Sequence, residues 1–190
     1  MEIGSFVLIG VVAAVITYAV IIYNNLVRLK HNVSKAWSNI DVLLKQRHDE
    51  LPKLVETCKQ YMGYEQETLE KVMRARSAVS QARHQGDVKA LGPAETQLRA
   101  GLINLFAVAE AYPELKANES FQHLQSRITG LENGIADRRE FYNDSVNINN
   151  IRIEQVPDVF LARFFGFPSR DLLEFSEQEK RDVDLKALFQ

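Results

Sequence analysis

The 190-residue sequence predicts an all-α protein with one transmembrane helix at its N-terminus and a helical bundle after it. Two observations predict this class. Residues 3–23 contain no Asp, Glu, Lys, Arg or His. Beyond them, apolar residues recur at every third or fourth position, which is the period of one helix face, and no alternating strand pattern of any length occurs.

The transmembrane helix is predicted from Ile3 to Tyr23. Its 21 residues would span about 31 Å as a helix, close to the hydrocarbon thickness of a bilayer. A secretory signal peptide is the alternative, but it would need a basic n-region and a shorter apolar stretch. We therefore expect an uncleaved membrane anchor.

Basic residues follow the apolar run and set its expected orientation. Arg28, Lys30 and Lys35 come after it, and only the chain terminus precedes it as a positive charge. The positive-inside rule then places the N-terminus outside and the large domain in the cytoplasm. These three bases are also candidate contacts for lipid headgroups or a partner.

Composition limits the rest of the chain. There are 23 basic and 25 acidic residues, a near-neutral balance that argues against nucleic-acid binding. The single Cys58 can form neither an intrachain disulfide nor a thiolate metal site by itself. The residues after the anchor suffice for one domain. We expect an anchor at 1–23, a cytoplasmic bundle at 24–167 and an acidic tail at 168–190.

The first helix of the bundle carries an ambiguity at Pro52. The apolar rhythm passes through it from Ile40 to Leu54 and continues to Val79, which favours one long kinked helix. The stretch from Arg47 to Pro52 also fits a helix end followed by a restart, with Asp49 as cap. The kink predicts three long helices and the turn predicts four.

Two later helices follow the same period. One spans about 98–109 and stops before Pro113, and the other opens near Asn118 and runs out before Pro157. The second ends in a tract rich in Asn, a poor helix former. Its amides either bond to a neighbouring helix and fix its register, or the helix end frays. Trp37, Asn143 and Asn147 are the candidate register or interface residues.

Four Phe residues lie between positions 160 and 167. A short helix here would be apolar over most of its surface. It either caps the bundle or dips into the lipid interface. Phe160, Phe164, Phe165 and Phe167 are therefore candidate contacts for lipid or a partner.

The sequence offers no catalytic, cofactor or metal site. The Glu119 and His123 pair has no second copy, as a di-iron bundle would require. Cys58 falls on an apolar stripe, where a buried thiol is expected rather than a thiolate. No glycine-rich phosphate loop occurs. We expect a protein that is not an enzyme.

Several of these stretches resemble the LemA family of bacterial membrane proteins. The resemblance rests on residues 23–27, 36–55, 109–118, 142–147 and 165–167. It implies a single-span protein of the bacterial inner membrane with four helices in an up-and-down arrangement, and hence a turn at Pro52. It implies no enzymatic activity. The tail at 182–190 departs from the short Pro-Val-x-Phe-like ending that members often carry.

We therefore expect a membrane-anchored scaffold that acts through self-association, as a homo-oligomer, or through a protein partner. The alternative is a lipid-directed protein that senses or shapes the bilayer through the juxtamembrane bases and the Phe cluster.

Overall fold

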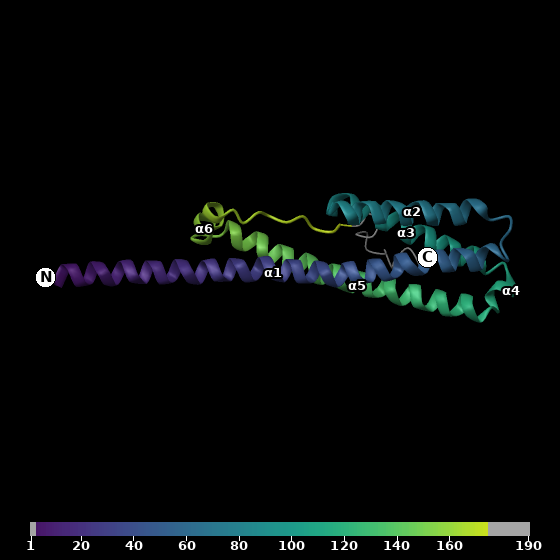
Figure 1. Cartoon of the computed structure of the whole chain (residues 1–190), viewed down its shortest axis with the longest axis horizontal. Helices are drawn as coiled ribbons and strands as arrows, with labels where there is room; N and C mark the ends of the chain where they lie inside the picture. The colour runs from purple at the N-terminus through teal and green to yellow at the C-terminus, as the bar shows by residue number, and fades with distance from the viewer. Residues whose placement is uncertain (1–2, 175–190) are drawn as a thin grey trace, which may run out of the picture. The chain divides into compact units, whose positions relative to one another are not determined.

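The computed structural model describes residues 3–174. All regular elements in this part of the chain are helices (Figure 1): α1 Ile3–Lys59, α2 Gln66–Gln85, α3 Val88–Ala109, α4 Pro113–Lys116, α5 Glu119–Glu154 and α6 Asp158–Phe165. The all-α prediction and the apolar N-terminal helix are confirmed. The up-and-down order of a four-helix bundle stays a prediction, and residues 175–190 of the predicted tail lie outside the described residues.

The chain divides into two compact units. Unit 1 contains residues 1–39 and 140–172, and unit 2 contains residues 40–139 and 173–190. Helices α1 and α5 each contribute to both units. The domain boundaries expected at residues 23 and 167 remain predictions.

Helix α1 continues through Pro52, because a side chain replaces the hydrogen bond that proline cannot make. Pro52 has no N–H for the carbonyl of His48, four residues earlier. Arg76 of α2 supplies the missing donor, with its Nε 3.0 Å from that carbonyl oxygen. The turn at Pro52 that the family resemblance favoured is therefore wrong, and the continuous helix is correct.

The actual break lies at residues 60–65, where no break was predicted. Met62 is buried and keeps the apolar rhythm through a segment that is not helical. Two long-range contacts hold this loop. Asn118 Nδ2 donates to Tyr61 Oη (3.1 Å), and Tyr112 Oη donates to Glu65 Oε1 (3.4 Å). Long helices therefore number four in the described residues, although Pro52 does not separate any two of them.

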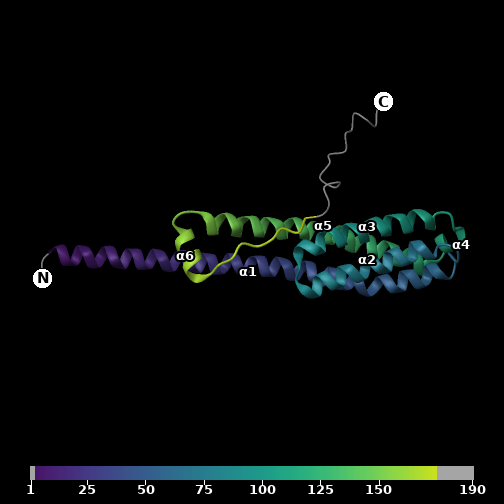
Figure 2. The ribbon, with the colours of Figure 1, turned by 90° about the horizontal axis from the view of Figure 1, so that it is seen from above.

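Helices α2 and α3 are joined by a two-residue turn and lie side by side (Figure 2). Gly86 adopts the left-handed conformation with φ 66° and ends α2. Asp87 then caps α3 by accepting a hydrogen bond from the Ala90 amide at 2.9 Å. Gly92 and Pro93 lie inside α3.

Gly92 is required by a close approach within unit 2. A Cβ atom built on Gly92 would lie 1.8 Å from the carbonyl oxygen of Glu174. The neighbouring Leu173 is buried. The chain after α6 therefore packs on α3 at a position where any side chain would displace it.

The core of unit 2 is apolar with one ionic group at its centre. Its apolar residues come from α1, α2, α3 and α5, including Ile40, Leu44, Leu54, Val72, Val79, Leu98, Leu102, Leu105, Phe121 and Ile128. Arg47 lies among them with a relative exposure of 1%. Its Nη2 is 2.5 Å from Glu95 Oε1, and its Nη1 is 2.6 Å from Glu132 Oε1.

We predict that Arg76→Ala destabilises the protein less when residue 52 is Ala than when it is Pro. Arg76→Ala leaves the His48 carbonyl without its donor and is expected to lower the free energy of unfolding by about 1–3 kcal/mol. In a Pro52→Ala background the new amide at residue 52 bonds that carbonyl, so the same change should cost less. Chemical denaturation of the four proteins in mild detergent, followed by circular dichroism, gives the coupling energy. Equal costs in the two backgrounds would contradict the assignment.

We also predict a large loss of stability for Arg47→Met. The variant keeps the apolar bulk but leaves the carboxylate of Glu95 buried without its cation, which costs about 3–5 kcal/mol. The same denaturation measurement checks it. Lys45→Met, at a neighbouring exposed position, is the control and should unfold like the wild type.

Candidate functional site

Helix α6 folds back onto α1 at the point where the apolar run ends. In unit 1, Ile22 and Leu26 of α1 form a buried cluster with Ile153 of α5 and Ala162 of α6. Phe167 packs against this cluster. The chain thus returns to its own N-terminal helix beside the last residues of the apolar run.

Aromatic rings line this junction. Tyr23, the last residue of the apolar run, meets Phe165 edge to face with ring centroids 4.8 Å apart, and it meets Phe167 at 5.9 Å. Phe164 packs in the same way on Phe165 at 4.9 Å. Edge-to-face pairs of this kind add a directional preference to simple burial. They place α6 at the level of Tyr23 along α1.

Two local features hold α6 in this position. Asp158, in its first turn, is 2% exposed and forms an ion pair with Arg152 at the end of α5. At the other end, Gly166 takes the left-handed conformation with φ 69°. The next amide, of Phe167, then donates to the Ala162 carbonyl at 2.9 Å. Both ends of the short helix are thereby fixed.

The outer side of α6 presents aromatic rings to solvent. Relative exposures are 66% for Phe160, 83% for Phe164 and 52% for Phe165. Phe160 and Phe164 are four residues apart, so they lie on the same side of the helix. Of the four predicted contact residues in this cluster, only Phe167 is half-buried. Phe165 and Phe167 thus contact Tyr23 of α1, while Phe160 and Phe164 are largely exposed.

The Asn-rich end of α5 holds the segment that follows α6. Asn150 donates from Nδ2 to the Arg170 carbonyl (2.8 Å) and accepts at Oδ1 from the Arg170 amide (2.9 Å). Tyr142 Oη donates to the Asp171 carbonyl at 3.0 Å. The helix runs unbroken to Glu154. Among the predicted register residues, Asn147 is exposed and Asn143 is half-buried. Sequence reasoning did not single out Asn150.

The other predicted residues of unit 1 lie on α1. Trp37 is half-buried and packs edge to face on Tyr142, with ring centroids 5.5 Å apart. Arg28, Lys30 and Lys35 are all exposed. Within residues 3–174, none of these three bases forms an ion pair with α6. They remain candidate headgroup contacts.

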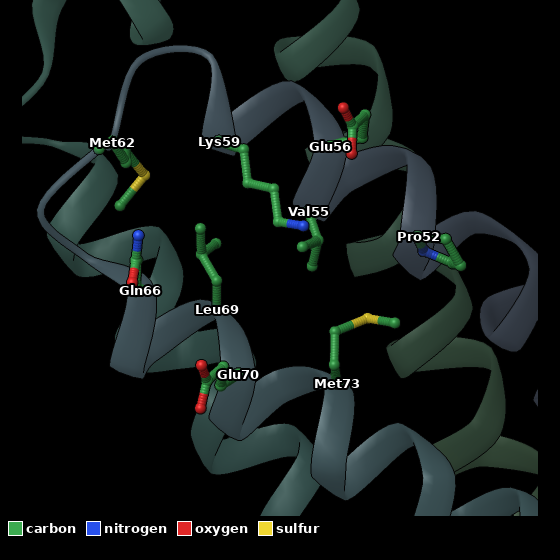
Figure 3. A pocket seen from close by; sticks show the side chains of 10 residues that line it. Pro52, Val55, Glu56, Lys59, Met62, Gln66, Leu69, Glu70 and Met73 are labelled. Atoms are coloured by element: carbon green, nitrogen blue, oxygen red, sulfur yellow. The ribbon is translucent and has the colours of Figure 1, made fainter.

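Unit 2 contains a cleft of about 680 Å³ between the end of α1 and the start of α2 (Figure 3). Its walls include Val55, Met62, Leu69 and Met73, with Lys59 among the polar side chains around them. None of the residues predicted for function lines it. Within residues 3–174 there is also no group of three or more His, Cys, Asp or Glu side chains that could hold a metal ion.

The titratable groups of unit 2 serve its packing. Burial raises the pKa of Glu95, and the two carboxylates beside Arg47 raise the pKa of its guanidinium against the opposing effect of burial. Burial and the charge of Arg76 lower the pKa of His48, whose Nε2 lies 2.7 Å from Arg76 Nη2. A neutral ring there accepts a hydrogen bond from the guanidinium. Burial raises the pKa of Cys58 to about 12.

The sequence is similar to a family model and to several known proteins. The model of the LemA family matches residues 36–186. Magnetosome protein MamQ 2 of Paramagnetospirillum magneticum is 25% identical over 94% of this chain and 74% of its own length. Magnetosome protein MamQ of Magnetospirillum gryphiswaldense is 25% identical over 81% of this chain and 65% of its own length. Protein LemA of Metamycoplasma hominis is 28% identical over 87% of this chain and 74% of its own length.

We predict that Cys58 is inert in the folded protein. A fully buried thiol with a pKa of about 12 has almost no thiolate near pH 8, and the thiolate is the reactive form. Ellman's reagent at pH 8 should therefore label the native full-length chain only at the rate of unfolding, and label it at once in denaturant. Rapid stoichiometric labelling of native protein would contradict this.

Proposed function

The chain belongs to the LemA family, and from this premise we propose that it is a non-enzymatic, single-pass membrane-anchored scaffold that acts through self-association. Helix α1 is long and apolar enough at its N-terminal end to cross a membrane. In this proposal the N-terminus lies outside a bacterial inner membrane and the remaining helices lie in the cytoplasm. Arg28, Lys30 and Lys35, which follow the apolar run, support that orientation.

The observation that carries the proposal is an exposed apolar stripe on α5. Phe141, Ile148 and Ile151 are 53%, 55% and 56% exposed. Their spacings of seven and three place them on one side of the helix. Large apolar side chains aligned and exposed in this way are typical of an interaction surface rather than of a solvated helix face.

A second copy of the chain fits this stripe without further assumptions. Two copies anchored in one membrane with the same orientation carry their α5 stripes at the same height. The stripes can then pair through a two-fold axis, in which the same surface of each copy is buried. A different protein partner would have to supply its own apolar stripe at that height.

We predict that Phe141→Ser or Ile148→Ser weakens a homo-oligomer. Full burial of one large apolar side chain stabilises an interface by about 1.5–3 kcal/mol. Both copies carry the substitution and each side chain is already about half-buried, so each variant should raise the dissociation constant roughly 10- to 100-fold. Light scattering after size exclusion in mild detergent, at several protein concentrations, measures the mass of the complex. Helix content from circular dichroism verifies folding.

Ile103→Ser is the matched control. Ile103 is 62% exposed on α3, outside the stripe, so its replacement should leave the oligomer unchanged. A wild-type chain that stays monomeric at all concentrations, or a stripe variant with wild-type mass, would contradict self-association through α5.

A further inference from the structure

We propose that α6 is a membrane-interface helix whose exposed Phe160, Phe164 and Phe165 insert into the same bilayer that α1 crosses. The inference rests on the membrane anchor of the proposed function and is independent of self-association. In this proposal the exposed Phe rings are covered by lipid, at the boundary between acyl chains and headgroups.

The depth of α6 follows from its contacts with α1. Tyr23 is the last residue of the apolar run that begins at Ile3, and Asn24 and Asn25 follow it, so it lies at the end of the hydrocarbon layer. Phe165 lies 4.8 Å from Tyr23 between ring centroids. Helix α6 is therefore held at the depth where amphipathic helices and aromatic rings are most favourable in a membrane.

The orientation of α6 suits this depth. Its buried residues, Asp158 and Ala162, are four positions apart and face the rest of unit 1. Phe160 and Phe164 point to another side and are 66% and 83% exposed. An eight-residue helix with three exposed Phe rings is poorly matched to water, whereas a bilayer beside α1 covers those rings in every copy of the chain.

Charge near α6 agrees with a headgroup layer. Arg163 is exposed on α6 between the Phe residues, and Arg28 is exposed on α1. Arg28 lies about 7.5 Å beyond Tyr23 along the helix axis, from the rise per residue. Basic side chains at that height meet the phosphates of the headgroups and favour anionic lipids.

Helix α6 is already folded and held in place by contacts within the chain before its rings insert into lipid. The ion pair between Arg152 and Asp158 and the left-handed Gly166 fix its two ends. Because α6 is folded and docked by contacts within the chain, insertion of its rings orders few additional groups.

The test uses the full chain in nanodiscs of phosphatidylcholine and phosphatidylglycerol. A nitroxide is attached to a Phe164→Cys variant, with the small signal of labelled wild type subtracted to account for Cys58. Power-saturation electron paramagnetic resonance then compares collisions with oxygen, which concentrates in hydrocarbon, and with a nickel chelate, which stays in water. We expect oxygen to dominate at residue 164.

Two matched labels set the scale. Tyr64→Cys lies on the loop after α1, where Tyr64 is 99% exposed, and should favour the nickel chelate. Val12→Cys lies within the apolar run and should favour oxygen. A label at residue 164 that matches Tyr64 would overturn the inference while the anchor stands.

Two further results are also decisive. A label at residue 164 that neither reagent reaches would mean that protein, and not lipid, covers α6. That result would overturn the inference. A water-like signal at residue 12 would overturn the anchor and this inference together. Phe160→Cys provides an independent label on the same side of α6 and should repeat the result for residue 164.

Discussion

One side-chain contact keeps the longest element of the protein intact. Pro52 cannot bond the carbonyl of His48, and the guanidinium of Arg76 takes its place with Nε at 3.0 Å. Without that donor, the carbonyl of His48, a half-buried residue, would be an unsatisfied acceptor, which costs on the order of 1–3 kcal/mol. Because it has one, α1 extends from Ile3 to Lys59 and supplies both the apolar run and core residues of unit 2.

Each unit contains a polar contact of this kind that joins segments distant in sequence. Apolar stripes bury equally well at several helix rotations, whereas charged and amide groups require a particular atom opposite them. In unit 2, Arg47 selects Glu95 and Glu132. In unit 1, Asn150 binds both backbone groups of Arg170, as a neighbouring strand would. These contacts specify which segments meet, while apolar burial supplies most of the stability.

Unit 1 also leaves two apolar surfaces uncovered, and they differ in kind. The stripe on α5 is linear and follows helical spacing, which suits another helix. The Phe cluster on α6 is compact and lies beside the end of the apolar run, which suits a lipid interface. In our two proposals, the stripe attaches the chain to copies of itself and the Phe cluster contacts the membrane.

The sequence by itself determined the class, the apolar run, the end of α3 and both ends of α5, because these depend on neighbours within a few residues. Asn118 illustrates this, since its Oδ1 accepts from the Phe121 amide at 3.0 Å. Only the tertiary structure decided whether α1 continues through Pro52, where the chain breaks at residues 60–65, and which groups pair with Arg47 and Asn150. Each of these depends on a group distant in sequence, and local periodicity carries no information about which distant group will supply a hydrogen bond.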